Sequence, residues 1–420
     1  MTAASIIDLT VASHLPTPDI SVVMPCLDEE ESVGLCVARA REGIARSGLT
    51  GEVVICDNGS TDRSVEVAAA AGARVVHQPQ RGYGSAYRKG FEYARGRYLV
   101  MGDSDGSYDF TELSALVRKL HDGSADYVLG SRFDGEILPG AMPWLHQRVG
   151  NPVLTGVLNR FFGLRVSDAH SGLRAFTRSA YDRLGLATEG MEFASEIVIN
   201  AAQAGLRVAE VPITYHPRIG ESKLHSFRDG WRHLRFMLLL APKFLFMIPG
   251  TVLLVLGLGG QIALMPGLTV GNQKLGVHFA VLATLLALLG YQLLMFGVFT
   301  KAFARVRRPG QQDRTLDAFD AHFTLERGLI VGGFYFVTGF AIDAWILVDW
   351  LVSHGGTLDA LRPALLALTL MALGAMTAFG SFFLSLFYDP STAPAQRSRK
   401  AAAVVAVTPA TTEPVNPPAA

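Results

Sequence analysis

The chain has 420 residues, enough for two or three domains, and its 37 basic side chains balance 37 acidic ones. Because balanced charge creates no overall positive field, we expect no nucleic-acid partner. Half of the residues are hydrophobic, which is high for a soluble protein, and the excess lies toward the C-terminal end. The three cysteines have no metal-ligand spacing and are expected to be buried thiols in a reducing compartment.

Residues 1–19 and 389–420 have compositions typical of disordered segments. The first has no basic region and no apolar core of the length that a signal peptide requires. The second is rich in Ala, Pro and Thr. We therefore expect a disordered leader and a disordered tail.

Between residues 20 and 128, short apolar runs alternate with helical patterns. The runs predict strands at Ile20–Pro25, Val53–Cys56, Arg74–His77, Arg97–Met101 and Tyr127–Leu129, and the patterns predict helices at Glu30–Arg46, Asp62–Ala71, Ser85–Ala94 and Thr111–Leu120. A less regular region follows, in which a helix at Glu192–Ala204 leads into a strand at Val208–Tyr215. This alternation predicts an α/β domain over residues 20–226, with a mostly parallel sheet covered on both faces.

Two carboxylates follow the buried run Tyr98–Met101, in the sequence Gly102-Asp103-Ser104-Asp105. The carboxyl end of such a strand faces the crevice where ligands bind in open α/β sheets. Mg²⁺ sits on one or two carboxylates plus phosphate oxygens, so the pair predicts a divalent-cation site for a substrate diphosphate. The competing interpretation is an ordinary strand-ending turn rich in Asp, Ser and Gly.

Four apolar stretches in the C-terminal part predict a membrane domain over residues 244–388. They are Phe244–Gln273, Leu275–Thr300, Gly328–Val352 and Pro363–Tyr388, and each exceeds the ~20 residues that a transmembrane helix needs. The third contains two carboxylates. We expect Asp349 at the membrane interface and Asp343 paired within the bundle, the alternative being a polar path.

The distribution of Lys and Arg predicts the orientation of these helices. The loop at 301–327 holds six such residues, whereas the two opposite loops offer only Lys274 and Arg362. By the positive-inside rule, this loop, the tail and the N-terminal domain should lie in the cytoplasm of a multi-pass plasma-membrane protein. Residues 227–243 carry Trp231 and other apolar side chains on one helical face, with arginines beside them. They predict an interfacial amphipathic helix, the alternative being a helix packed on the domain.

Eight short blocks follow one another in an order that resembles a known family. They are VVMPCLDEE at 22–30, VVICDNGSTD at 53–62, RGYGSA at 81–86, DSD at 103–105, GSRF at 130–133, DAHSGLR at 168–174, MEFASE at 191–196, and EVPI at 210–213 with RIGESK at 218–223. Together they resemble the inverting family 2 glycosyltransferases of GT-A fold. Within that family they look like the polyprenyl-phosphate branch, which includes dolichol-phosphate mannose synthase. The resemblance covers residues 20–240 and not the detailed sequence of the four spans.

The resemblance implies a nucleotide-sugar site with a metal ion. The implied nucleotide-sugar residues are Pro25, Leu27, Glu29, Asp57, Asn58, Gly82, Gly84, Ser104 and Arg174. Leu27 replaces the aromatic residue of the family's P-x-Y-N-E loop, and Asn58 stands where a second Asp is usual. For the two glycines the alternative is a helix entry turn. Asp103 and Asp105 match the D-x-D that binds Mg²⁺ or Mn²⁺.

The resemblance also implies a site for the acceptor. The residues implied to hold an acceptor phosphate are Arg132, Arg148, Arg218 and Lys223, and those implied to take part in catalysis are Asp103, Asp105, Arg132, Asp168, Arg218 and Lys223. Asp168 would lie beside the sugar. His170 stands in the same block and is expected to be structural.

The implied activity is transfer of a hexose from a UDP- or GDP-linked sugar to a polyprenyl phosphate, with inversion. The product would be a lipid-linked sugar for cell-envelope glycans or protein glycosylation. A phosphate monoester, whose second pKa is about 6, is mostly a dianion at neutral pH and needs no general base. A homo-oligomer is left open.

Two other functions are considered. A processive polysaccharide synthase carries a Q-x-x-R-W block after this domain, and residues 229–233 read DGWRH, which does not match. A non-catalytic membrane scaffold that keeps a nucleotide-binding fold would be favoured by loss of a D-x-D carboxylate or of the basic block. Neither is missing.

Overall fold

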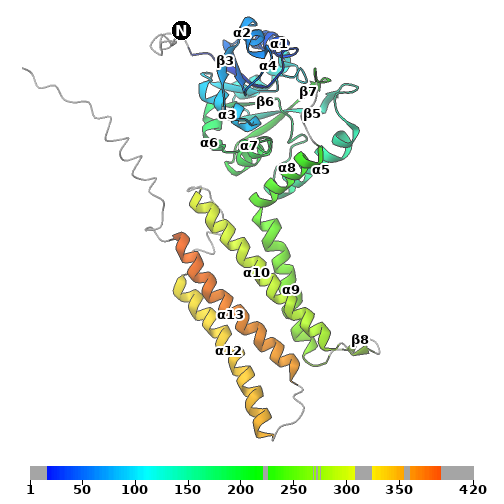
Figure 1. Ribbon diagram of the computed structural model, residues 1–420, viewed down its shortest axis with the longest axis vertical. Helices are drawn as coiled ribbons and strands as arrows, with labels where there is room; N and C mark the ends of the chain where they lie inside the picture. The colour runs from blue at the N-terminus through cyan, green and yellow to red at the C-terminus, as the bar shows by residue number, and fades with distance from the viewer. Residues whose placement is uncertain are drawn as a thin grey trace, which may run out of the picture. The chain divides into compact units, whose positions relative to one another are not determined.

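The computed structural model describes residues 17–220, 226–267, 269–270, 273–274, 276–307, 324–353 and 360–388. Most of the predicted leader, the whole predicted tail and Lys223 lie outside the described residues. The chain forms two compact units, residues 1–241 and 242–420 (Figure 1).

The first unit is built on a seven-stranded sheet with the order β3-β2-β1-β4-β6-β5-β7. Its strands are β1 (Ile20–Cys26), β2 (Gly51–Asp57), β3 (Arg74–His77), β4 (Tyr98–Met101), β5 (Tyr127–Ile137), β6 (Arg174–Thr177) and β7 (Val208–Tyr215). The first four are parallel, β6 runs antiparallel to both of its neighbours, and β7 is parallel to β5. The expected α/β fold with a mostly parallel sheet is thereby confirmed.

Helices cover both faces of this sheet (Figure 1). Successive strand residues point to opposite faces, so they contribute to two separate apolar clusters. Along β1, Val22 and Met24 face one cluster and Val23 faces the other. The first cluster includes residues of α1 (Val33–Ser47), α2 (Ser64–Ala70) and α4 (Leu113–His121). The second includes residues of α3 (Tyr83–Tyr93), α5 (Asn151–Phe162), α6 (Arg178–Leu184) and α7 (Phe193–Gln203).

The helical turn η3 (His146–Gly150), helices α5 and α6, and strand β6 were not predicted from the sequence. The last is four residues long and begins at Arg174, which is fully buried. Charged side chains are almost never fully buried unless they are paired. The arginine at the start of this segment therefore argued against a buried strand there. A short helical turn occupies Phe110–Glu112, so α4 begins at Leu113 and not at the predicted Thr111.

Helix α8 (Ser226–Leu240) ends the first unit and is amphipathic. Met237 is fully buried in the second apolar cluster, and His233 lies 2.8 Å from the Ser195 hydroxyl. By contrast, the Trp231 side chain is 59% exposed. One side of the helix therefore packs on the domain, while placement of its other side in the lipid headgroup layer stays a prediction.

Within the described part of the second unit, four helices are long and apolar enough to cross a membrane. They are α9 (Ile248–Leu264), which continues the π-helical turn η4 (Lys243–Met247), α10 (Val277–Arg307), α12 (Leu325–Val352) and α13 (Leu361–Tyr388). Between α9 and α10 lie two short strands, β8 (Thr269–Val270) and β9 (Gln273–Lys274). The four predicted spans thus correspond to four observed helices.

Small residues bring the membrane helices together in pairs. A Cβ atom on Gly257 would lie 2.2 Å from the backbone nitrogen of Ala287, and one on Gly374 would lie 2.5 Å from the carbonyl oxygen of Gly332. Such close backbone approach is typical of transmembrane helix packing. The expected pairing of Asp343 is not observed, since this half-buried carboxylate has no hydrogen bond or ion pair within the described residues.

Candidate active site

Asp103 and Asp105 follow the carboxyl end of β4, which runs parallel to β1. Two hydrogen bonds fix the segment between them. The Ser104 hydroxyl donates to the Pro25 carbonyl at 2.6 Å, and the Ser32 hydroxyl donates to the Ser104 carbonyl at 2.8 Å. Ser104 therefore determines where the two flanking carboxylates lie.

The Asp103 carboxylate accepts two hydrogen bonds from tyrosines of α3. The Tyr83 and Tyr87 hydroxyls lie 2.9 and 3.2 Å from its Oδ1 atom. Burial, together with the negative charge of Asp105, raises the pKa of Asp103 to about 6. These two tyrosines were not predicted as site residues from the sequence. The available signal was their spacing of four residues, which places both on one face of the helix that follows Gly82.

The Asp105 carboxylate is tied to two segments. Its Oδ1 atom accepts hydrogen bonds from the Ser107 backbone at 3.0 Å and from the Ser107 hydroxyl at 2.5 Å. Its Oδ2 atom lies 3.3 Å from Arg218, whose guanidinium also pairs with Glu29. The structure thus brings together three predicted site residues that are far apart in the sequence.

The chemistry of this cluster fits a divalent cation. The described residues contain no group of three or more His, Cys, Asp or Glu side chains that could hold a metal on their own. Asp103 and Asp105 supply two carboxylates, and Mg²⁺ is commonly bound by one or two carboxylates plus substrate phosphates. Burial and the charge of Asp105 both raise the pKa of Asp103, and a bound cation would oppose both effects by favouring the carboxylate form.

Asp57 ends β2 and organises the turn that follows it. Its carboxylate accepts hydrogen bonds from the backbone of Ser60 at 3.0 Å and Gly59 at 3.3 Å, and lies 3.1 Å from His77 Nδ1. Burial raises the pKa of Asp57, but the hydrogen bonds from Ser60 and His77 outweigh this effect and lower it below the usual value. The group is therefore a carboxylate at neutral pH.

Asn58 binds the loop that precedes α3. Its amide nitrogen donates to the carbonyl oxygens of Gln78 at 2.9 Å and Gln80 at 2.8 Å, and its Oδ1 atom accepts from the Gly82 backbone at 2.8 Å. An aspartate at this position could not donate to the two carbonyls. The residue that departs from the family pattern thus has a specific local partner set.

Gly82 and Gly84 allow close contact with the loop before α7. A Cβ atom on Gly82 would lie 2.3 Å from the Glu189 carbonyl oxygen, and one on Gly84 would lie 2.5 Å from that of Thr188. Gly82 also has a φ of 145°, which disfavours any side chain. The glycines therefore form the entry turn of α3, and their contact with a diphosphate stays a prediction.

The turn after β1 contains Leu27 and Asp28. Leu27 is half-buried, and Asp28 has a positive φ of 51°, a conformation that Asp tolerates better than most residues. The Asp28 carboxylate accepts from the Thr61 backbone at 2.7 Å, so it joins this turn to the one after β2.

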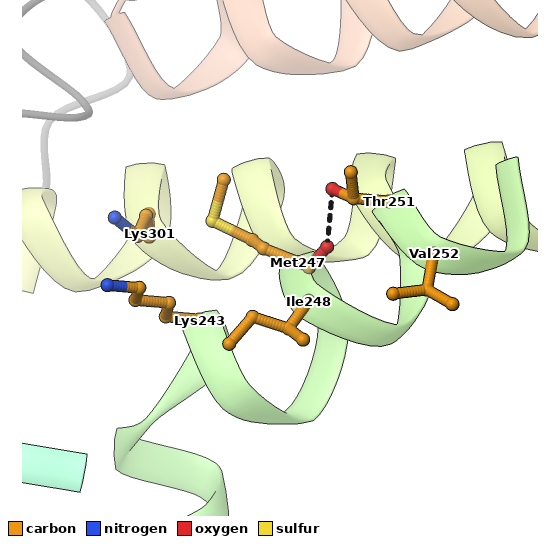
Figure 2. A pocket seen from close by; sticks show the side chains of 6 residues that line it. All are labelled: Lys243, Met247, Ile248, Thr251, Val252 and Lys301. Atoms are coloured by element: carbon orange, nitrogen blue, oxygen red, sulfur yellow. Dashed lines mark hydrogen bonds between the residues drawn. The ribbon is translucent and has the colours of Figure 1, made fainter. Parts of the chain in front are cut away.

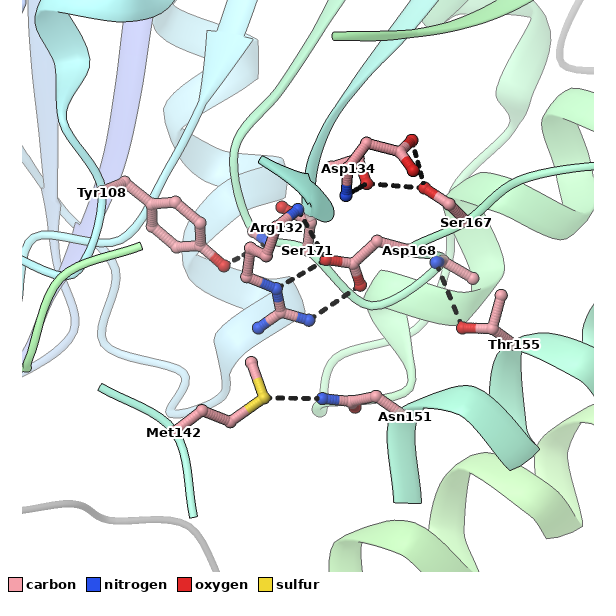
Figure 3. A network of polar contacts seen from close by, with 12 residues as sticks. Tyr108, Arg132, Asp134, Met142, Asn151, Thr155, Ser167, Asp168 and Ser171 are labelled. Atoms are coloured by element: carbon pink, nitrogen blue, oxygen red, sulfur yellow. Dashed lines mark hydrogen bonds and ion pairs between the residues drawn. The ribbon is translucent and has the colours of Figure 1, made fainter. Parts of the chain in front are cut away.

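A second cluster is centred on a buried ion pair between Arg132 and Asp168 (Figure 3). The arginine Nε and Nη2 atoms lie 2.6 and 2.8 Å from the two carboxylate oxygens, and the arginine backbone also donates to the carboxylate at 3.1 Å. The guanidinium lies over the Tyr215 ring at 5.0 Å. Burial lowers the pKa of Arg132, but the charge of Asp168 more than offsets this and raises it.

Glu210 holds the loop that carries Asp168. It accepts hydrogen bonds from the Ser167 backbone at 2.8 Å, from the Ser167 hydroxyl at 2.9 Å and from the Asp168 backbone at 3.2 Å. Glu210 belongs to the EVPI block, but no role was predicted for it from the sequence. An acidic residue within an otherwise apolar strand was the available signal.

Gly172 joins the two clusters. A Cβ atom on Gly172 would lie 2.8 Å from Asp103 Oδ2, and its backbone nitrogen donates to the Tyr108 hydroxyl at 2.6 Å. Two buried atoms in this region, Ser171 Oγ and Arg218 Nε, have no hydrogen-bond partner among the described residues. Because an unpaired buried polar group costs about 1–3 kcal/mol, a polar ligand that paired with them would be stabilised.

Arg174, Arg148 and His170 make no hydrogen bond or ion pair with Asp103 or Asp105 among the described contacts. Arg174 is fully buried and donates to the carbonyls of residues 169, 171 and 194, so it supports the DAHSGLR loop. Arg148 is exposed in the π-helical turn η3 (His146–Gly150). His170 Nε2 lies 3.3 Å from the Ser195 hydroxyl, while its buried Nδ1 has no partner among the described residues. Ligand contacts of Arg148 and Arg174 stay predictions.

Comparison with known families gives two matches along the chain. The family model described as "Glycosyl transferase family 2" matches residues 21–185. The one described as "Glycosyltransferase family 2 C-terminal transmembrane region" matches residues 298–388. The two matches fall in the first and the second compact unit, respectively.

Curated relatives cover most of the chain. The low-salt glycan biosynthesis hexosyltransferase Agl6 of Haloferax volcanii is 43% identical over 87% of this chain and 88% of its own length. The dolichyl-phosphate hexose transferase of the same organism is 34% identical over 50% of this chain and 89% of its own length. A crystal structure of glucosyl-3-phosphoglycerate synthase from Mycobacterium tuberculosis is 24% identical, with a TM-score of 0.43 over 53% of this chain and 80% of that one.

Proposed function

The chain belongs to glycosyltransferase family 2, and we propose that it transfers a hexose from a nucleotide sugar to a polyprenyl phosphate. The names of two relatives, a hexosyltransferase and a dolichyl-phosphate hexose transferase, support the sugar and the lipid acceptor. The donor would be linked to UDP or GDP, and attack opposite the leaving nucleotide would invert the anomeric centre. The product would be a lipid-linked sugar for cell-envelope glycans or protein glycosylation.

The observation that carries this proposal is the position of Asp103 and Asp105 at the carboxyl edge of the sheet, where Asp103 lies beside Gly172 of the DAHSGLR loop. These two carboxylates would hold Mg²⁺ or Mn²⁺. When bound, the metal supplies charge stabilisation to the diphosphate leaving group. Asp57 and the loop fixed by Asn58 would bind the nucleoside side of the donor.

The acceptor phosphate needs no general base, because it is mostly a dianion at neutral pH. The task of the protein is then to align the phosphate and to offset repulsion between two polyanions. We assign this task to Arg132, Arg218 and Lys223. Asp168 would keep the Arg132 guanidinium in one orientation, and Arg suits phosphate because it can donate two parallel hydrogen bonds.

We also propose a location and a domain arrangement. A catalytic domain at 20–226 and an interfacial helix at 227–243 would lie on the cytoplasmic side of the plasma membrane. The four spans at 244–388 would anchor them. The excess of Lys and Arg in the loop at 301–327 supports this orientation.

The test is a panel of radiolabelled nucleotide sugars offered to membranes that contain the protein and short polyprenyl phosphates, with product scored in the organic phase. We expect one donor to give a product with one sugar per lipid. EDTA and Asp105→Asn should nearly abolish it, and Mg²⁺ or Mn²⁺ should restore the EDTA-treated enzyme. Asp122→Asn, at an exposed carboxylate, is the matched control. Full activity in EDTA, or a polymeric product, would contradict the proposal.

A further inference from the structure

A pocket of about 330 Å³ lies at one end of the membrane unit, between η4–α9 and α10 (Figure 2). Its lining residues are Lys243, Met247, Ile248, Thr251, Val252 and Lys301. Lys243 is the first residue of the first candidate span, and Lys301 lies near the end of the second, which runs to Arg305.

The two lysines meet because α9 and α10 are antiparallel. A Cβ atom on Gly257 would contact Ala287, one on Gly250 would contact Gly290, and one on Gly297 would lie 2.8 Å from Met247. As the residue number falls along α9, it therefore rises along α10. This packing brings the start of one span and the end of the other to the same end of the unit.

The pocket has a cationic end and an apolar wall. In Figure 2 the ammonium groups of Lys243 and Lys301 point to the same side, and Met247, Ile248 and Val252 line the rest. The Thr251 hydroxyl donates to the Met247 carbonyl at 2.8 Å, so it is engaged within the helix. Such a surface suits a ligand that joins an anion directly to hydrocarbon.

We propose that this pocket binds the phosphate headgroup and first isoprene units of a polyprenyl phosphate, an inference that rests on the proposed function. A phosphate monoester carries a charge of about −1.5 to −2 at pH 7, which two ammonium groups match. A phosphodiester phospholipid carries only one negative charge. A nucleotide sugar or free phosphate has no hydrocarbon to cover the apolar wall. All six residues that line the pocket belong to the membrane unit, so the pocket would be a further contact for the acceptor, in addition to the proposed arginine contacts.

The test measures lipid binding to the full-length protein by native mass spectrometry, with undecaprenyl phosphate as the probe. We expect the double variant Lys243→Gln/Lys301→Gln to bind it about ten- to hundredfold more weakly, the loss expected for charge-assisted hydrogen bonds. The matched control Lys274→Gln/Arg362→Gln removes two positive charges outside the pocket, one in β9 and one in the first turn of α13, and should change binding less than twofold. Val252→Trp, which fills the pocket without changing charge, should also weaken binding.

Four outcomes separate the alternatives. Unchanged binding of undecaprenyl phosphate by the double variant overturns the inference. An equal loss of phosphatidylglycerol binding also overturns it, because the lysines would then be a general anionic-lipid contact. Inorganic phosphate should compete poorly, and strong competition would assign the site to a free anion. Lysine-dependent binding in a protein that turns over no nucleotide sugar would leave the pocket standing and refute the proposed function instead.

Discussion

Arg132 and Asp168 form a two-point ion pair whose side chains are 7% and 0% exposed, with donor–acceptor distances of 2.6 and 2.8 Å. The arginine expected to hold the acceptor phosphate is therefore already oriented by a carboxylate. The backbone nitrogen of Asp168 in turn donates a hydrogen bond to the Glu210 carboxylate, which holds the residue in place. A phosphate that reached Arg132 would meet a guanidinium of fixed direction, which lowers the entropy lost when the phosphate binds.

Asp168→Asn should destabilise the protein by about 3–5 kcal/mol, because it leaves a buried guanidinium without its charge partner. The matched control is Glu42→Gln, which breaks the exposed pair of Glu42 with Arg46 and should cost about 0–1 kcal/mol. Thermal unfolding of the purified protein in detergent compares the two. Equal melting temperatures would mean that the buried pair contributes no more than a surface contact.

Asn58→Asp should weaken nucleotide binding, since an aspartate cannot donate to the carbonyls of Gln78 and Gln80. Each carbonyl that loses its partner costs about 1–3 kcal/mol if it stays buried. Asn58→Ala loses these two bonds and also the one accepted from the Gly82 backbone, but it places no charge beside the carbonyls. The repulsion between a carboxylate and two carbonyl oxygens should make the aspartate the more damaging of the two. Calorimetric titration with a nucleoside diphosphate and Mn²⁺ measures the effect. Wild-type affinity in both variants would show that the loop before α3 does not shape the nucleotide site.

The framework of the site was predictable from the sequence because it depends on local patterns. Buried parallel strands are short apolar runs, and their carboxyl ends lie at one edge. The position of Asp103 and Asp105 after β4 follows from the run Tyr98–Met101 alone. The four membrane helices are predictable for the same reason, since length and hydropathy suffice.

The supporting contacts were not predictable because they depend on tertiary packing. Nothing in the local sequence indicates that Arg174 begins a buried strand, or that its guanidinium donates hydrogen bonds to backbone carbonyls. The same holds for the pairing of Glu29 with Arg218, which are 189 residues apart. The spacing of Tyr83 and Tyr87 places both on one helical face, but it does not indicate that their hydroxyls donate to Asp103. A sequence motif identifies the residues of a site, but the contacts of each residue follow only from the three-dimensional structure.

Arg218→Gln should have opposite effects on metal binding and on turnover. In this structure Arg218 lies 3.3 Å from Asp105 Oδ2, so its charge opposes a cation at the same carboxylate. Removing it should tighten Mn²⁺ binding a few-fold in the absence of nucleotide. It should lower kcat/KM by about ten- to hundredfold if the guanidinium binds a phosphate. Arg207→Gln, at an exposed pair, is the control for both assays. Weaker metal binding together with slower turnover would indicate general damage to the site.

Metal affinity should depend on pH through Asp103, whose pKa is raised to about 6 by burial and by the charge of Asp105. Below that pH a proton competes with the cation, so affinity for Mn²⁺ should fall about tenfold per pH unit and level off above it. The sign for metal-free stability is opposite. Because the folded pKa exceeds the unfolded one, the contribution of this group is lost as pH rises toward 6. Titrations between pH 5 and 8 check the first effect, and a flat profile would contradict it.

The proposed orientation can be tested by cysteine labelling, because the three native cysteines are buried and free. Burial raises the pKa of Cys26 to about 11 and of Cys36 and Cys56 to about 12, so at neutral pH they are unreactive thiols. A cysteine at Gly356 should react with an impermeant maleimide added to intact cells, whereas one at Gln311 should react only after permeabilisation. The cysteine-containing parent without either substitution should give no signal under both conditions. The proposed orientation would be refuted if Gln311→Cys were labelled from outside and Gly356→Cys were protected. The loop at 301–327 would then lie outside the cell.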